Sequence, residues 1–96
     1  MTDIPELTEK DFKRAIKASV RRRLRAGKVE SGQDIVDLRR FVGLTQEDFA
    51  RALGISVHTL RNWEQNHRKP QGPALALIRL AARHPRIIRE SLVSAA

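Results

Sequence analysis

The sequence predicts an all-α fold with a single small hydrophobic core. Apolar residues recur every three or four positions over most of the chain, which is the spacing of one helix face. A serine or threonine followed three residues later by an aspartate indicates a helix start, and this pattern occurs at Thr8, Ser31 and Thr45. No segment alternates apolar and polar residues as a strand does. A chain of 96 residues is long enough for one domain and an additional arm.

The first predicted helix covers residues 9–26 and is strongly basic. Thr8 and Asp11 form its capping box, and Gly27 is suited to end it. Behind the cap, an apolar stripe recurs every four residues, at Phe12, Ile16, Val20 and Leu24. Residues 10–28 hold nine basic residues and one acidic residue, a balance of +8 that equals the formal net charge of the chain. We expect residues 1–30 to form an arm before a domain at residues 31–96.

Five further helices are predicted within residues 31–96. Capping residues and prolines indicate where they start: after Ser31, Thr45 and Ser56, and at Pro73 and Pro85. Glycine ends the first of them at Gly43, and the polar segment 66–72 is expected to be a loop. The fold class that follows is an all-α five-helix bundle preceded by a basic amphipathic N-terminal helix.

Composition excludes several classes of function. The chain has no cysteine, and its three histidines lack the spacing of metal ligands, so we expect no metal site. No nucleophile with a base, paired carboxylates or glycine-rich phosphate loop occurs, so neither catalysis nor a cofactor is expected. No window approaches the ~20 apolar residues of a membrane span, and the N-terminus has no apolar signal segment. These features favour a cytoplasmic protein, and the positive charge favours a polyanionic partner.

Residues 44–70 carry the most specific pattern in the chain. Two short predicted helices joined at Gly54 have apolar residues at the offsets of helices that pack on each other, with Trp63 in the core. This is the helix-turn-helix of DNA-binding proteins, whose second helix lies in the major groove. Arginine pairs with guanine and asparagine with adenine, so residues on the outer face of that helix are expected to read bases. They are Val57, His58, Arg61 and Asn62.

Four other residues are expected to contact the DNA backbone, which positions a protein without reading sequence. They are Gln46 at the start of the preceding helix, Thr59, and Arg68 and Lys69 in the following loop. Glu64 is expected to form an ion pair on the helix surface. The alternative for the outer face of this helix is the ordinary solvated surface of a helical bundle.

The segments LTQEDFARALGIS and LRNWEQNHRKP resemble the helix-turn-helix of the XRE family, which includes phage lambda-type repressors and Cro. The downstream GPALALIRLAARHP is similar to antitoxins of the HigA type, small autorepressors encoded beside an RNA-cleaving toxin. The resemblance covers residues 33–85 and implies a lambda-repressor-like bundle, a dimer on a palindromic operator and a toxin partner. It assigns base reading to Val57, His58 and Asn62, and a backbone contact to Gln46. Val57 stands where glutamine is often found.

Both ends of the chain leave alternatives open. The N-terminal helix is interpreted as a toxin-binding segment, as an additional DNA-clamping arm, or as a packed helix that shields the domain. The residues expected to bind a toxin or other partner are Phe12, Ile16, Val20, Arg21, Arg22, Arg23 and Leu24. The C-terminal apolar residues either complete the monomer core or form part of a dimer interface. The expected interface residues are Ile87, Ile88, Leu92 and Val93.

The sequence therefore predicts a sequence-specific DNA-binding repressor that acts as the antitoxin of a type II toxin–antitoxin system. We expect it to repress its own promoter and to neutralise an RNA-cleaving toxin by direct binding. Two alternatives are a stand-alone phage-like repressor without a toxin, and a protein-interaction toxin inhibitor with weak DNA binding.

Overall fold

Six α-helices make up the part of the chain that the computed structural model describes, residues 16–94, the side chains of residues 93 and 94 excepted. In chain order they are α2 (Ala18–Arg25), α3 (Gly32–Val42), α4 (Gln46–Leu53), α5 (Val57–Glu64), α6 (Pro73–Arg83) and α7 (Pro85–Ser94). No strand occurs among these residues, and α3 to α7 are the five helices predicted for the bundle. The prediction of an all-α fold is confirmed.

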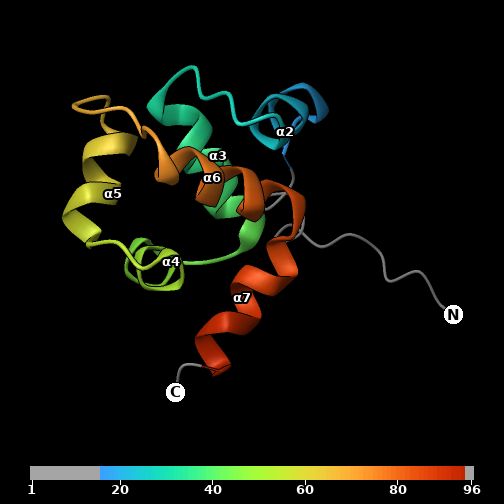
Figure 1. The fold of residues 1–96 in the computed structure, drawn as a ribbon, viewed down its shortest axis with the longest axis vertical. Helices are drawn as coiled ribbons and strands as arrows, with labels where there is room; N and C mark the ends of the chain where they lie inside the picture. Colours follow the sequence, from blue (N-terminus) through green and yellow to red (C-terminus); the bar gives the residue numbers. More distant parts are fainter. Residues whose placement is uncertain (1–15, 95–96) are drawn as a thin grey trace, which may run out of the picture.

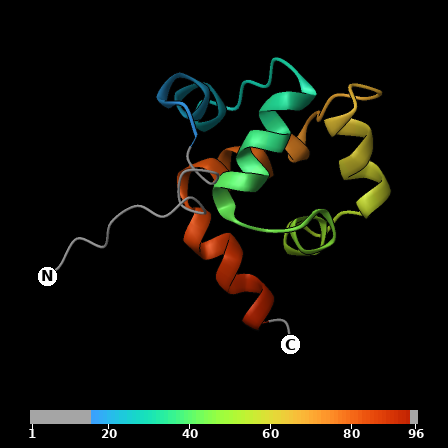
Figure 2. The same cartoon turned by 180° about the vertical axis from the view of Figure 1, so that it is seen from behind.

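Helices α2 and α5 lie on opposite sides of the molecule, with α3 and α6 between them (Figure 1). The same separation is seen from behind in Figure 2. Helix α4 joins α5 through a short turn, and α7 packs on α3, α4 and α6. This arrangement leaves the outer face of α5 far from α2.

The hydrophobic core lies between these helices and receives side chains from each of them. The largest fully buried side chains are Leu24 of α2, Ile35, Leu38 and Val42 of α3, Phe49 of α4, Leu60 of α5 and Ile78 of α6. Full burial of such a side chain contributes about 1.5–3 kcal/mol. Helix α3 supplies three of them and is therefore the central helix of the bundle.

Helix α2 is shorter than the predicted helix over residues 9–26. It begins at Ala18, because Lys17 has an extended backbone (φ −61°, ψ 137°) that cannot continue a helix. The prediction is therefore wrong at residues 16 and 17, and residues 9–15 lie outside the described part of the chain. Gly27 follows the helix with φ +78°, the left-handed conformation typical of a helix end.

Two of the predicted caps form on the helix-turn-helix. The Thr45 hydroxyl accepts a hydrogen bond from the Asp48 amide (3.1 Å) at the start of α4. At the start of α5, the Ser56 hydroxyl accepts one from the Thr59 amide (3.0 Å). Each cap satisfies a backbone donor that has no partner within its helix.

The predicted side-chain cap at Ser31 is wrong. Ser31 precedes α3 as its N-cap residue, but its side chain makes no capping hydrogen bond. The buried Asp34 carboxylate accepts instead from the Glu30 amide (2.9 Å) and from the Arg23 guanidinium (2.6 Å). The arginine on α2 thus holds the aspartate, which links α2 to the first turn of α3.

The start of α3 packs directly on the end of α5. Gly32 lies so close that a Cβ atom there would overlap the carbonyl oxygens of Trp63 and Glu64. Its amide donates to the side-chain oxygen of Asn66 (2.8 Å), a residue with a left-handed backbone (φ +64°) just after α5. This contact anchors the C-terminal end of α5 to the central helix.

Candidate nucleic-acid interface

The two helices of the motif are joined by a tight turn at residues 54–56. Gly54 ends α4 with φ +74°, and a Cβ atom there would meet nothing within 4 Å. Glycine is therefore favoured here by its backbone conformation and not by a close neighbour. Leu53, Leu60 and Trp63 are buried where the helices meet. The core role predicted for Trp63 is confirmed.

A largely buried ion pair fixes the end of α5 against α3. The Arg39 guanidinium donates to both oxygens of the Glu64 carboxylate, from Nε at 2.8 Å and from Nη2 at 3.3 Å. Arg39 also donates to the Leu44 carbonyl (3.2 Å). The expectation that Glu64 forms an ion pair is confirmed, but its placement on the surface is wrong, because only 5% of its side chain is exposed.

The same carboxylate orients Gln46, the first residue of α4. The Gln46 side-chain amide donates to Glu64 (2.9 Å), and its carbonyl oxygen accepts from Arg61 Nε (3.2 Å). Arg61 also donates to the Glu47 carboxylate (3.3 Å). A continuous set of hydrogen bonds therefore connects α3, α4 and α5 and holds Gln46 at the N-terminus of α4. A helix N-terminus in this position is suited to a phosphate group.

The predicted base-reading residues lie on α5, where Val57 packs against the edge of the core and the other three lie on the side away from the buried Leu60. His58 and Arg61 are exposed, and Val57 and Asn62 are half-buried. Within the described residues, the side chains of His58 and Asn62 have no hydrogen-bond partner. These two side chains are therefore free to pair with base edges, whereas Arg61 is partly engaged by α4.

The predicted backbone-contact residues border this face. The Thr59 hydroxyl is hydrogen-bonded to the Ser56 hydroxyl (2.9 Å) at the start of α5. Arg68 and Lys69 are exposed in the loop after the helix. The amide of Arg68 donates to the Asn62 carbonyl (3.2 Å), which holds this loop against the end of α5. Gln46, described above, completes the group.

Sequence reasoning missed Arg39. It lies four residues after Ile35 and next to Leu38, two fully buried residues, and so occupies the side of α3 that borders the core. A charged residue in such a position requires a partner. The position of Arg39 beside buried residues could have indicated a need for a partner, but it does not say which acidic residue pairs with Arg39.

Two of the apolar residues of the N-terminal helix that were expected to bind a partner are buried in the bundle. Val20 and Leu24 are buried in the core, 9% and 0% exposed, so they cannot form an apolar stripe for a partner. This part of the expectation is corrected: the stripe packs against the bundle, as in the shielding alternative. Ile16 is half-buried against the core, and Phe12 lies outside the described residues.

The arginines of that helix also differ in their surroundings. The Arg21 guanidinium donates from Nε to the Ala82 carbonyl (3.1 Å) and lies 4.8 Å from the centre of the Phe41 ring. Arg23 is held by Asp34, whereas Arg22 is exposed. Two of the three arginines therefore help to attach α2 to the bundle.

The residues of α7 that were expected to form a dimer interface also differ in how exposed they are. Ile88 is 5% exposed and belongs to the core, so its expected place in an interface is corrected. Ile87 is 56% exposed and Leu92 is half-buried, whereas the side chain of Val93 lies outside the described residues. Leu80 of α6 is also exposed, at 41%.

Two further observations concern residues 16–94. No group of three or more histidine, aspartate or glutamate side chains is placed to hold a metal ion there. None of the helices in this range is long and apolar enough to cross a membrane.

Comparison with known proteins agrees with this geometry. Residues 35–81, from α3 through α6, match the Helix-turn-helix family. These residues form a helix-turn-helix domain of that family. The XRE-type motif and the lambda-repressor-like bundle predicted from the sequence are thereby confirmed. Helix-turn-helix domains of this family are DNA-binding domains and not catalytic ones.

Two curated relatives extend the comparison. The chain is 42% identical over 55 residues to the antitoxin HigA-2 of Vibrio cholerae serotype O1, an alignment that covers 57% of this chain and 53% of that protein. It is 39% identical over 57 residues to the uncharacterized HTH-type transcriptional regulator YiaG of Escherichia coli K12, covering 59% of each chain. The chain thus spans only a little over half the length of these relatives. No solved structure gives a significant match.

Proposed function

We propose that this regulator is a sequence-specific repressor that reads its operator with the outer face of α5. The observation that carries the proposal is the pair of unengaged side chains, His58 and Asn62, on a helix whose other side is anchored by the buried Arg39–Glu64 pair. Rigid placement of polar groups is what base reading requires. Val57 would pack on a thymine methyl, and Arg61 would contact guanine after leaving its partners on α4.

The proposed backbone contacts surround this reading face. Gln46 and the free amides at the start of α4 would bind one phosphate, with Thr59 close to the start of α5. Arg68 and Lys69 would bind another from the loop after α5. These contacts would set the depth and angle of α5 in the major groove.

We also propose that the repressor binds a palindromic operator as a homodimer. Two copies place two recognition helices in successive major grooves about 34 Å apart. The exposed Ile87 and Leu80 supply the apolar surface for this association, together with the half-buried Leu92. A DNA-binding role implies a cytoplasmic location, which stays a prediction.

The proposed partner protein is an RNA-cleaving toxin encoded beside this chain, which would make the chain a type II antitoxin that represses its own promoter. Similarity to the antitoxin HigA-2 supports this proposal. Similarity to YiaG at nearly the same identity favours the second candidate, a stand-alone regulator without a toxin. The two candidates share the operator and differ in the protein partner.

Replacing His58 and Asn62 together with alanine is expected to reduce the preference for operator over random DNA by about 30-fold or more, because each good base contact is worth ~1–3 kcal/mol and the variant loses two of them. The operator is first selected from random duplexes, and binding is then measured by fluorescence anisotropy. The mass of the complex by sedimentation should correspond to two chains on each palindrome.

The control for this experiment is Gln71→Ala, an exposed residue just before α6 for which no DNA contact is proposed. It should keep the full operator preference, and both variants should melt within a few degrees of the unaltered chain. If the His58 and Asn62 variant discriminates as well as the control does, α5 is not the reading helix.

The product of a neighbouring short reading frame is expected to inhibit the growth of cells that express it alone. Co-expression of this chain is expected to restore their growth. The two proteins should co-purify, and the purified chain should block RNA cleavage by its partner. The variant with alanine at positions 58 and 62 should neutralise equally well, because the residues expected to contact a toxin lie on the N-terminal helix and not on α5. Failure of the unaltered chain to bind or neutralise any neighbouring product would favour the stand-alone regulator.

A further inference from the structure

Two cationic helices pack side by side on the face opposite the recognition helix. Helix α2 carries four arginines and α6 carries two, and neither contains an acidic residue. Among the described residues, Arg23 is the one arginine of these six with a carboxylate partner. Like charges on packed helices repel each other unless an anion lies between or beside them. The molecule thus has a concentration of positive charge that its described acidic residues leave unbalanced.

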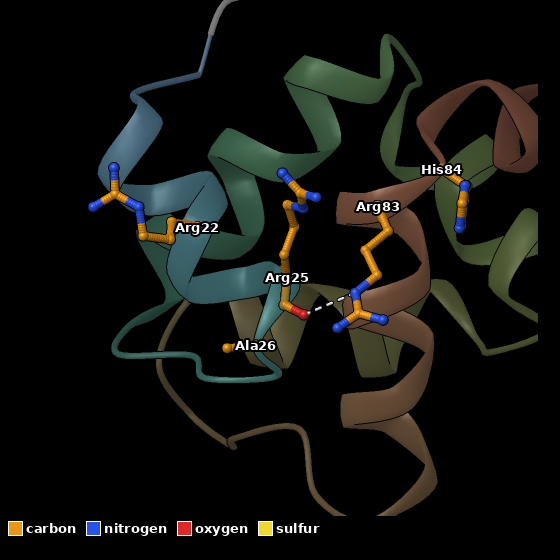
Figure 3. Close-up of a pocket in the computed structure, with 5 residues that line it drawn as sticks. All are labelled: Arg22, Arg25, Ala26, Arg83 and His84. Atoms are coloured by element: carbon orange, nitrogen blue, oxygen red, sulfur yellow. Dashed lines mark hydrogen bonds between the residues drawn. The ribbon is translucent and has the colours of Figure 1, made fainter.

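Part of this charge lines one cavity of about 420 Å³ where α2 ends near the junction of α6 and α7. Its lining residues are Arg22, Arg25, Ala26, Arg83 and His84. Figure 3 shows the side chains of Arg25 and Arg83 lying between Arg22 on one side and His84 on the other. Arg22 and Arg25 of α2, Arg83 of α6 and His84 just after α6 thus border one open cavity, with the Arg22 side chain pointing away from the other three in Figure 3.

One hydrogen bond positions the cluster without neutralising it. Arg83 Nε donates to the backbone carbonyl of Arg25 (3.0 Å), which ties the end of α6 to the end of α2. The two terminal nitrogens of Arg83 keep their donors for a ligand. Within residues 16–94, the side chains of Arg22, Arg25 and His84 have no ion pair or hydrogen bond.

The chemistry of these groups favours a phosphate ligand. Guanidinium groups match the oxygens of phosphate in a two-point geometry, and several of them together suit an anion that carries more than one charge or lies beside another anion. The lining of this cavity offers no apolar group larger than the Ala26 methyl, whereas a protein partner is typically held by buried aromatic or aliphatic anchors. A second cavity that shares Arg22 and Arg25 does contain such groups, Ile16 and Phe41, so the test below includes an acidic peptide.

The position of the cavity separates it from the operator. Helices α2 and α5 lie on opposite sides of the bundle in both views (Figures 1 and 2). A duplex in contact with the outer face of α5 therefore lies away from Arg22 and Arg25. This geometry argues against the interpretation of α2 as a clamp on the same operator.

We propose that this cavity binds a phosphate group of a nucleotide or of a nucleic-acid strand other than the duplex read by α5. Arg22, Arg25 and Arg83 bind its oxygens, and His84 donates a further hydrogen bond. The site extends the proposed repressor function: the protein contacts operator DNA with one face and a second phosphate-bearing ligand with the other.

The test uses the full chain with two probes, inorganic phosphate and a non-operator DNA single strand of about 10 nucleotides, a length within the range of single-strand binding sites. Amide chemical shifts locate each probe, and anisotropy gives the affinity for the strand. We expect shifts at Arg25, Ala26 and His84. Competition between the probes would show that both bind at one site. Binding of phosphate without binding of the strand would identify the ligand as a nucleotide or a free anion. Either result supports the proposal.

The decisive variant is Arg22→Gln with Arg25→Gln, because both side chains are exposed and neither has a side-chain hydrogen bond in the described structure. It should bind the strand at least 10-fold more weakly. The slope of log binding constant against log salt concentration should become less steep by about 1.4, since each phosphate contact to a single strand contributes about 0.7 to that slope. The matched control, Arg40→Gln with Arg51→Gln, removes the same charge from other exposed positions and should bind nearly as well as the unaltered chain.

Three results would overturn the proposal: shifts at α5 instead of the cavity, equal loss of binding in the two double variants, or tighter binding of an oligoglutamate peptide than of either probe. The last result would assign the cavity to an acidic protein segment. The test is independent of the repressor proposal, because alanine at positions 58 and 62 should leave phosphate binding intact. Conversely, the Arg22 and Arg25 variant should keep its operator preference.

Discussion

Replacing Glu64 with alanine is expected to lower the free energy of unfolding by about 3 kcal/mol, which is a large fraction of the stability of a small domain. The substitution leaves the Arg39 guanidinium, itself only 17% exposed, without its carboxylate. It also removes the acceptor that orients Gln46. Urea denaturation followed by circular dichroism measures the loss, and operator affinity should fall as well because Gln46 is no longer held at the start of α4.

The informative control replaces both members of the pair, Arg39→Met with Glu64→Leu. Removing both charges avoids an unpaired buried ion, and apolar replacements of similar size are often neutral for stability. We expect this double variant to recover most of the stability but not the operator affinity. A single variant that loses less than about 1 kcal/mol would mean that the pair is solvated and does not anchor α5.

Gly32→Ala is expected to lower the free energy of unfolding by about 3 kcal/mol, the upper end of the range for overpacking. The added methyl group would overlap the backbone oxygens of Trp63 and Glu64, and backbone atoms cannot move aside as the end of a flexible side chain can. The shift of α3 would also break the hydrogen bond from the Gly32 amide to Asn66. Equilibrium denaturation again gives the measurement.

Gly54→Ala is the matched control for this substitution. Its Cβ atom would meet nothing within 4 Å, so its cost is limited to the left-handed backbone, about 1–2 kcal/mol. The comparison separates the overlap at Gly32 from the general effect of replacing glycine. Equal losses in the two variants would refute the claim that α3 and α5 are in backbone contact at Gly32.

Local signals in the sequence predicted most of the fold. The hydroxyl caps at Thr45 and Ser56, the glycines after α2 and α4, and the proline at the start of α6 act over one helix turn and need no knowledge of the rest of the chain. The spacing of Leu60 and Trp63 likewise identified the buried side of α5, and therefore the outer side with the exposed His58 and Arg61.

Contacts between helices that are distant in sequence could not be predicted in this way. The pattern of Val20 and Leu24 shows an apolar stripe but not whether that stripe meets the bundle or a partner. The same limit applies to Asp34, whose spacing from Ser31 matches a capping box although Arg23 holds its carboxylate. In each case a tertiary contact decides between two arrangements that are equally compatible with the local sequence.

Because α5 is anchored at its C-terminal end, the DNA sequence preference can diverge among related helix-turn-helix proteins without loss of that anchor. Gly32, Glu64 and Asn66 hold the last turn and the residue beyond it, whereas the unengaged side chains lie earlier along the outer face. The two sets share no residue, so exchanges at His58 and Asn62 leave the attachment untouched. New binding-site preferences are therefore accessible through single substitutions that cost little stability, without a compensating change elsewhere in the bundle.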